Sequence, residues 1–252
     1  MNSAPVIQMS DLYKSFGTQR VMNGLNLDIP RGKITVIIGR SGEGKSVLLK
    51  TMIGLMAPDA GKVLIDGIDL FELSSRKQNQ LRKKFGMLFQ NAALFDSMTV
   101  YDNVAFPLRE HTELGEDEIE VKVLDKLAKV GLKGVGAKMP AELSGGMRKR
   151  VGLARALMLD PEIILYDEPT TGLDPILTDS IDNLILETQK SFGLTSVVVS
   201  HDIPSTMKMA DKVAMLHEGR ILEEGAPEVF RRSQDPWIQN FLLGKADKDF
   251  IG

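Results

Sequence analysis

The stretch Gly39–Ser46, read Gly-Arg-Ser-Gly-Glu-Gly-Lys-Ser, constrains this chain more than any other. An apolar run typical of a β-strand, residues 34–38, precedes it, and a run with helical character, residues 47–55, follows. Glycines allow successive backbone N–H groups to point at one phosphate, and a helix that begins there adds unpaired N–H groups and the positive end of its dipole. The pattern GxxxxGK[ST] between a strand and a helix therefore predicts a phosphate-binding P-loop.

Two side chains of this loop carry specific chemistry. Lys45 is expected to reach the β- and γ-phosphate oxygens of a nucleotide, and the hydroxyl of Ser46 is expected to coordinate Mg²⁺. The predicted nucleotide-binding residues are Gly39, Arg40, Ser41, Gly42, Glu43, Gly44, Lys45, Ser46 and Val47.

Composition limits the remaining possibilities. The 252 residues suit one large α/β domain or one domain with an inserted subdomain. The absence of cysteine excludes disulfides and thiolate catalysis, and the net charge of −3 does not favour non-specific binding to nucleic acid. There is no signal-like N-terminus and no apolar run near the ~18 residues that span a bilayer, so we expect a cytoplasmic protein that meets a membrane only through a partner.

The predicted secondary structure changes twice along the chain. The opening is rich in predicted strands, at 6–9 and 20–29, with a turn at 14–17. No strand is predicted between residues 99 and 160, where helical spacing of apolar residues dominates. We therefore expect a helical subdomain over about 91–160.

The α/β core is expected to consist of residues 1–90 and 161–244, followed by a tail at 245–252. Because strands and helices alternate on both sides of the helical subdomain, the core sheet should be mostly parallel. The whole of 1–244 then forms one domain with a β-rich N-terminal subdomain. Two charged runs, an acidic one at 110–120 and a basic one at 148–150, are interpreted as solvated helix faces.

Polar residues stand at the ends of several apolar runs. Asp167 and Glu168 close the strand at 163–166, where an acid beside a P-loop binds Mg²⁺ and a second can act as general base toward water. Gln90 and His201 end two further predicted strands. Because the carboxyl ends of parallel strands converge on one crevice, these four side chains are expected to meet at the nucleotide.

A second anion-binding helix end is predicted inside the helical subdomain. Ser144 can cap a helix that begins with Gly145 and Gly146, whose N–H groups stay open. A helix end in that position is not expected to fold back onto its own P-loop. We therefore expect a second copy of the chain to complete the site, with Ser144 of one facing Lys45 of the other.

Together these motifs resemble those of the nucleotide-binding subunits of ABC transporters, and they occur in the family's order over roughly residues 6–244. By that resemblance the motifs are Walker A at 39–46, the Q-loop glutamine Gln90, the signature at 143–147, Walker B at 163–167 with Glu168, the D-loop at 172–174 and the switch histidine His201. Phe16 matches the aromatic residue that stacks on adenine, with Tyr13 as the alternative.

The resemblance implies a fold, a set of roles and an assembly. The fold is the α/β P-loop NTPase fold of ABC type, and the activity is ATP hydrolysis that drives a membrane partner. Two subunits would pair head to tail around two ATP molecules. The implied roles are catalysis by Glu168, His201 and Gln90, Mg²⁺ binding by Ser46, Gln90 and Asp167, and contact with the other subunit's ATP by Ser144, Gly145 and Gly146.

One difference from the family's usual motifs points to a subfamily. The family's signature usually ends in Gln, and Met147, which stands here, cannot replace the hydrogen bonds of an amide. Ser-Gly-Gly-Met, together with residues 89–96 and 103–110, is similar to the ATPases of Mla-type transporters. Those systems move phospholipid between the inner and outer membranes of Gram-negative bacteria. The implied partners are an integral permease, a small STAS-domain protein and a periplasmic MCE lipid-binding protein, with this chain on the cytoplasmic face of the inner membrane.

The permease is expected to dock near residues 90–108. The apolar side chains there are either core or the walls of the docking groove, and both interpretations stay open for Leu94, Phe95, Met98 and Val100.

Other functions are compatible with parts of the pattern. The chain is alternatively an ABC ATPase that energises a transporter for another solute, or a soluble ABC ATPase without a transport role. A P-loop kinase would not need Ser144–Gly146 or His201, and a non-hydrolysing scaffold would not need Glu168.

Overall fold

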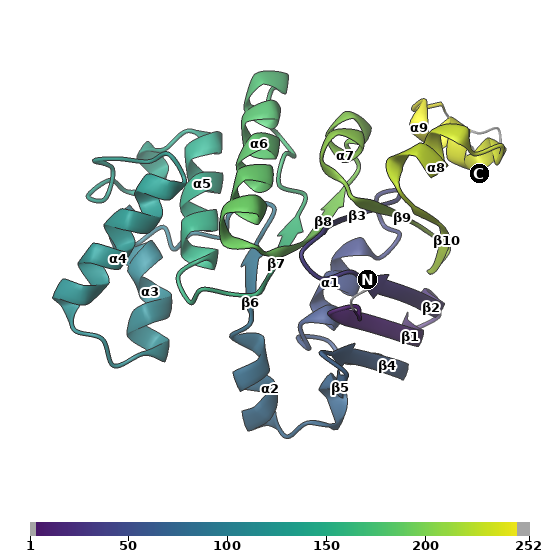
Figure 1. Ribbon diagram of the computed structural model, residues 1–252, viewed down its shortest axis with the longest axis horizontal. Helices are drawn as coiled ribbons and strands as arrows, with labels where there is room; N and C mark the ends of the chain where they lie inside the picture. Colours follow the sequence, from purple (N-terminus) through teal and green to yellow (C-terminus); the bar gives the residue numbers. More distant parts are fainter. Residues whose placement is uncertain (1–3, 246–252) are drawn as a thin grey trace.

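The computed structural model describes residues 4–245, and two sheets organise them (Figure 1). One is a four-stranded antiparallel sheet in the order β2-β1-β4-β5, and the other is a six-stranded sheet in the order β10-β9-β3-β8-β7-β6. The strands are β1 (Ile7–Phe16), β2 (Gln19–Ile29), β3 (Ile34–Ile38), β4 (Ala60–Ile65), β5 (Ile68–Asp69), β6 (Phe85–Leu88), β7 (Ile163–Asp167), β8 (Thr195–Ser200), β9 (Lys212–His217) and β10 (Arg220–Gly225).

The six-stranded sheet is parallel except at one edge. β3 pairs in parallel with β8 and β9, and β7 pairs in parallel with β6 and β8. Only β10 runs antiparallel, because it forms a hairpin with β9. This arrangement confirms the predicted fold class and the mostly parallel core sheet.

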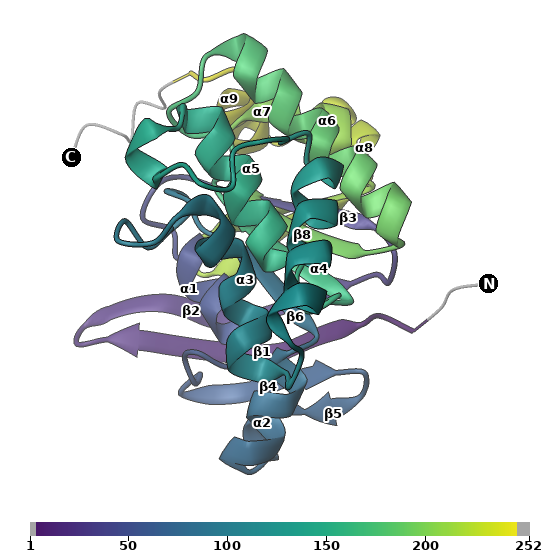
Figure 2. The same ribbon diagram turned by 90° about the vertical axis from the view of Figure 1, so that its left-hand side faces the viewer.

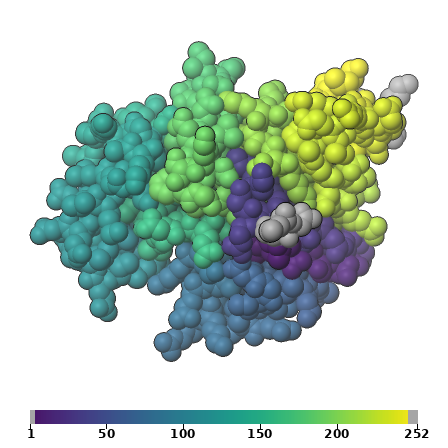
Figure 3. All heavy atoms as spheres, viewed as in Figure 1, coloured from purple at the N-terminus to yellow at the C-terminus, as the bar shows by residue number. Residues whose placement is uncertain are grey.

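Helices cover both faces of this sheet. The α-helices are α1 (Lys45–Met52), α2 (Ser75–Arg82), α3 (Val100–His111), α4 (Glu116–Lys129), α5 (Gly145–Ala156), α6 (Pro175–Phe192), α7 (Ile203–Met209), α8 (Pro227–Arg232) and α9 (Pro236–Leu242). Short 3₁₀ turns occur at Leu70–Glu72 and Pro140–Glu142. α3, α4 and α5 lie together at one end of the molecule, shown in teal in Figures 2 and 3.

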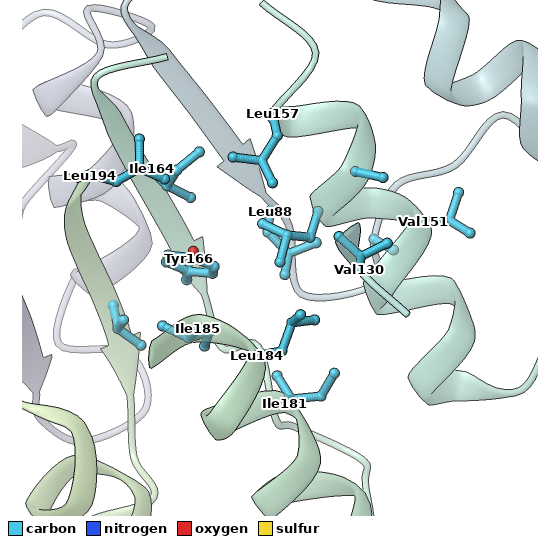
Figure 4. Close-up of a cluster of buried hydrophobic side chains, with 14 of the residues drawn as sticks. Leu88, Val130, Val151, Leu157, Ile164, Tyr166, Ile181, Leu184, Ile185 and Leu194 are labelled. Atoms are coloured by element: carbon cyan, nitrogen blue, oxygen red, sulfur yellow. The ribbon is translucent and has the colours of Figure 1, made fainter. Parts of the chain in front are cut away.

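The alternation of side chains along the buried strands divides the interior into two cores. In β3, Ile34, Val36 and Ile38 face one core, and Ile37 faces the other. The first core packs α6 and the helices α3, α4 and α5 against the sheet, and Figure 4 shows this core around Tyr166. The second core encloses α1 between the two sheets through Leu48, Leu49 and Met52. α1 is therefore fixed on both sides, which makes its N-terminus a rigid platform.

Several of the helices bury one face and expose the other. On α6, Ile181, Leu184, Ile185 and Thr188 point inward. The N-cap of α3 is Thr99, whose hydroxyl accepts a hydrogen bond from the backbone N–H of Asp102. The acidic run at 110–120 is exposed, as expected of a solvated face.

Two local predictions were wrong. The turn expected at 14–17 is the end of β1, which continues to Phe16, and only residues 17–18 form the turn. Register shifts after Met9 let β1 continue past a polar stretch while it pairs with β2 on one side and β4 on the other. The basic run is also not a uniformly solvated face, because Lys149 is 5 % exposed.

Candidate nucleotide site

The P-loop connects the buried strand β3 to α1, and its glycines are required by close packing. A Cβ on Gly44 would lie 2.3 Å from a methyl group of Val21, and the φ of Gly44 is +95°. A Cβ on Gly39 would lie 2.6 Å from the backbone oxygen of Leu216. The loop therefore brings its backbone nearer to its surroundings than any other residue type allows, and it leaves the N-terminus of α1 open.

The side chain of Lys45 contacts the backbone of its own P-loop. Its Nζ donates hydrogen bonds to the backbone oxygens of Gly39 at 2.8 Å and Arg40 at 2.9 Å, and it lies 3.9 Å from Glu168 Oε1. The side chain is 7 % exposed, and burial lowers the pKa of Lys45, opposed by the charge of Glu168. An ammonium group that is poorly hydrated and held in place can exchange carbonyl partners for phosphate oxygens at little reorganisation cost.

Two of the three predicted oxygen ligands of Mg²⁺, Ser46 and Asp167, lie together. The hydroxyl of Ser46 donates to Asp167 Oδ1 at 3.0 Å. In octahedral coordination at about 2.1 Å, neighbouring oxygen ligands of Mg²⁺ are separated by roughly 3 Å, so this pair fits that ion. Burial raises the pKa of Asp167, and the Ser46 hydrogen bond opposes that effect. The third predicted ligand, Gln90, lines a pocket that Ser46 also lines.

Glu168 is held by an unusual backbone. Its φ is +49°, in the left-handed region, and its backbone N–H donates to the oxygen of Val199 on β8 at 3.0 Å. Its carboxylate Oε2 lies 2.7 Å from Nδ1 of His201 and accepts a hydrogen bond from the Thr171 hydroxyl at 3.1 Å. A carboxylate fixed in this way can take a proton from a water molecule placed beside it.

These side chains surround one pocket of about 490 Å³. It is lined by Ser41, Gly42, Gly44, Lys45, Ser46, Val47, Gln90, Glu168, Thr171 and His201. The structure thus brings Gln90, Glu168 and His201 to the P-loop, and Asp167 reaches the site through its hydrogen bond with Ser46. The predicted residues Gly39, Arg40 and Glu43 do not line this pocket. None of the signature residues, Ser144 to Gly146, lines the pocket, so the chain does not close the pocket with its own signature.

The signature forms the start of α5. The Ser144 hydroxyl accepts a hydrogen bond from the backbone N–H of Met147 at 3.3 Å, which makes Ser144 the predicted N-cap. The two glycines that follow pack against the D-loop and the start of α6: ideal Cβ positions on Gly145 and Gly146 lie 3.3 and 3.4 Å from methyl groups of Leu173 and Leu177. Ser144 is exposed and Gly146 is buried, and this helix end and the start of α6 therefore form one packed unit.

Phe16 is one of the two aromatic residues considered for adenine. It lies at the tip of the β1–β2 hairpin with 47 % of its surface exposed. The next residues of the hairpin, 19–21, line a pocket of about 420 Å³ together with P-loop residues 40–43. The phenol of Tyr13 lies instead close to Gly24.

Two basic residues of the site were not predicted. The Lys149 ammonium donates to the backbone oxygens of Gln90 and Glu168, the latter at 3.4 Å, and burial lowers its pKa. Arg155 donates to the backbone oxygens of Ala92 and Ala93 at 2.8 and 2.9 Å. No sequence signal indicated that these two members of α5 point inward toward the Q-loop.

The stretch after Gln90 contains both core and surface residues. Val100 is fully buried, Leu94 and Met98 are partly buried, and Phe95 is exposed and packs on Phe106 with ring centroids 5.0 Å apart. These two rings help to line an apolar groove of about 370 Å³, whose walls are Phe85, Gly86, Met87, Phe89, Ala93, Phe95, Phe106, Pro107, His111, Arg155, Ala156 and Leu159.

The comparisons with known proteins agree with this geometry. The family model described as ABC transporter matches residues 22–171. The chain belongs to this family. It is the ATP-binding subunit of an ABC transporter, and it hydrolyses ATP to energise transport.

Curated relatives carry two different transport names. The intermembrane phospholipid transport system ATP-binding protein MlaF of Haemophilus influenzae is 45 % identical over 242 residues, which cover 96 % of this chain and 92 % of that protein. The probable ribonucleotide transport ATP-binding protein mkl of Mycobacterium leprae is 47 % identical over 239 residues, which cover 95 % of this chain and 69 % of that protein.

Solved structures share the fold. CbiO1 of Clostridium perfringens, part of the ABC transporter complex cbiONQ, aligns with a TM-score of 0.84 and 32 % identity over 96 % of this chain and 97 % of that one. The ATP-binding cassette MJ0796, in a dimeric post-hydrolysis state bound to ADP and phosphate, aligns with a TM-score of 0.80 and 30 % identity over 88 % of this chain and 98 % of that one. Among residues 4–245, no helix has the length and apolar character needed to cross a membrane.

Proposed function

We propose that this chain powers a transporter that moves phospholipids between the inner and outer membranes of a bacterium, bound through a permease at the cytoplasmic face of the inner membrane. The observation that carries this proposal is the identity with MlaF, which extends over nearly the full length of both chains. A ribonucleotide transporter is the second candidate, because mkl is similarly identical over a smaller share of its own length.

The proposed reaction takes place at a site shared by two subunits that pair head to tail. The P-loop and Lys45 hold the phosphates of ATP, and Phe16 stacks on the adenine. Ser144, Gly145 and Gly146 of the partner subunit cover the γ-phosphate with open helix N–H groups. The exposed N-cap Ser144 of α5 and the open pocket at the P-loop support this pairing. The MJ0796 cassette, which shares the fold, forms a dimer.

Within that site we assign catalysis to Glu168, which removes a proton from water, with His201 holding the carboxylate through their 2.7 Å contact. Ser46, Asp167 and Gln90 would hold Mg²⁺, which neutralises charge on the phosphates when it is bound. Gln90 also connects the site to the groove, because the docking stretch begins with it.

The groove at Phe95 and Phe106 is the proposed contact with the permease, within residues 90–108. Its apolar walls and its position directly after Gln90 support this role. We also propose the division into a core of residues 1–90 and 161–244 and a helical subdomain of 91–160. Within the tail predicted at 245–252, residues 246–252 lie outside the described residues, and any role of the tail stays a prediction.

The test is to purify the chain from its native membranes with whatever is bound to it. We expect a permease, a small STAS-domain protein and an MCE-type protein, and we expect ATPase activity of the complex in detergent to rise with added phospholipid and not with ribonucleotides. Stimulation by ribonucleotides alone would instead establish the second candidate.

A matched pair of variants tests the groove. Phe95→Asp should lose the permease while the isolated chain keeps its ATPase rate, because Phe95 does not line the nucleotide pocket. Val121→Asp places the same charge at a 70 % exposed site on α4 and should retain the permease. Retention of the permease by both variants would refute the docking assignment.

A further inference from the structure

A second hollow of about 750 Å³ adjoins the nucleotide pocket. Ser41 and His201 line both spaces, so the two lie next to each other. The other walls of the hollow are the start of α7, residues 202–204, and the end of α9 with the residues after it, 240–245. Ile203, Pro204 and the run Phe241–Leu243 make much of this wall apolar, unlike the nucleotide pocket.

An exposed aliphatic side chain lies next to the signature. Ile176, the second residue of α6, is 82 % exposed, more than any other large hydrophobic residue among those described. Its neighbour Leu177 packs against Gly146, and Leu173 packs against Gly145. A single exposed isoleucine is ordinary on a protein surface. Here, however, it belongs to the same packed unit as the helix end that must reach the other subunit.

We propose that, in the ATP-bound dimer, Ile176 of each subunit inserts into the apolar hollow beside the partner's nucleotide pocket. This inference rests on the proposed head-to-tail dimer. Once the signature covers the partner's pocket, the start of α6 must land beside that pocket. The neighbouring hollow at residues 19–21 and 40–43 is bordered by Arg20, Glu43 and Glu218. The hollow at α7 and α9 is also lined by Arg40, Asp202 and Lys245, but it adds aliphatic and aromatic walls that the neighbouring hollow does not have.

The contact gives the C-terminal helix a part in ATP-dependent pairing. Twofold symmetry makes the contact occur twice in each dimer. α9 is also joined to the P-loop of its own chain: the Trp237 ring lies 4.0 Å from the ring of His217, whose Nδ1 is 3.3 Å from Glu43 Oε1. The inserted Ile176 would therefore contact α9, which is connected to the P-loop of the same chain through Trp237, His217 and Glu43.

Disulfide trapping tests the contact directly, because the chain has no cysteine of its own. In a Glu168→Gln background, full-length chains carrying Ile176→Cys are mixed with chains carrying Leu243→Cys, under mild oxidation with and without Mg-ATP. We expect an ATP-dependent mixed disulfide dimer. Chains carrying Val121→Cys, mixed with the Leu243→Cys chains, serve as the matched exposed control and should not cross-link.

Affinity gives an independent measurement. Ile176→Gln in the Glu168→Gln background should raise the dissociation constant of the ATP-bound dimer on the order of 100-fold by analytical ultracentrifugation. Burial of one isoleucine side chain is worth about tenfold or more, and it is lost at two symmetric sites. Val121→Gln should leave the constant unchanged.

The possible outcomes separate the two proposals. If the Glu168→Gln parent dimerises in ATP but Ile176→Gln has no effect and no mixed disulfide forms, the insertion is wrong and the dimer stands. If the parent remains monomeric in saturating ATP, the head-to-tail dimer itself fails, and the insertion fails with it.

Discussion

Replacing Lys149 with methionine should break the link between Gln90 and Glu168 without removing a predicted contact to the nucleotide. The Lys149 ammonium bridges the backbone oxygens of Gln90 and Glu168, and the side chain is 5 % exposed. Methionine keeps the aliphatic stem and removes both hydrogen bonds. Each bond to a charged donor is worth about 1.5–3 kcal/mol, but the change also removes the cost of burying the charge, which is what lowers the pKa of Lys149.

The net loss in the free energy of unfolding should therefore be about 1–2 kcal/mol. For a chain of this size that corresponds to a fall in Tm of roughly 2–8 °C. The effect on catalysis should be larger, because Glu168 is held at a φ of +49° and a displacement of its carboxylate by about 1 Å can cost on the order of 100-fold in rate. We expect kcat to fall roughly 10- to 100-fold and the KM for ATP to change less than threefold.

Steady-state phosphate release and thermal unfolding, measured on the same preparations, check this expectation. Lys122→Met, which removes a charge from an exposed position on α4, is the control and should match the parent in both assays. A Lys149→Met variant with a lowered Tm and an unchanged kcat would show that Lys149 only stabilises the fold and does not position Glu168.

Two further predictions concern carboxylates, one partly buried and one fully buried. Glu168→Gln should bind ATP normally but hydrolyse it about 10²- to 10⁴-fold more slowly, as expected for loss of a general base; phosphate release within tenfold of the parent would contradict this role. Asp182 is 2 % exposed, accepts a hydrogen bond from the Ser205 hydroxyl at 2.7 Å through Oδ2, and leaves Oδ1 without a partner. Burial raises its pKa above 3.8, so stability is lost as pH rises from about 4 through the raised pKa. Asp182→Asn should raise the free energy of unfolding at pH 8 by on the order of 1 kcal/mol and by less at pH 5, and urea titrations that show an equal difference at both values would refute it.

The strand-to-helix context of the P-loop was predictable because it depends on local rules. Buried strands read as continuous apolar runs, and residues 34–38 form β3 with the expected bounds. The convergence of Asp167, Glu168 and His201 followed from parallel topology alone. The structure places Glu168 between Lys45 and His201, but the roles assigned to these residues stay predictions until activity is measured.

Other features depend on tertiary packing that no local pattern records. Lys149 and Arg148 are adjacent basic residues, and only the register of α5 turns Lys149 inward and leaves Arg148 exposed. α7 was not predicted because its seven residues, beginning Ile203-Pro204, are too short for a helical period to show. β1 extended beyond its predicted end because pairing on both edges overrides its polar residues.

The central claim is that each nucleotide site is built from two subunits, and complementation tests it most directly. A Lys45→Ala chain has a defective P-loop and an intact signature, and a Ser144→Arg chain has the reverse. Each alone should be inactive. Half of the dimers in an equal mixture contain both chains, and each of these has one intact site. The mixture should therefore recover about a quarter of the parent ATPase rate, if dimers form at random and sites act independently. A mixture no more active than the separate variants, or substantial activity of Ser144→Arg alone, would contradict the shared site.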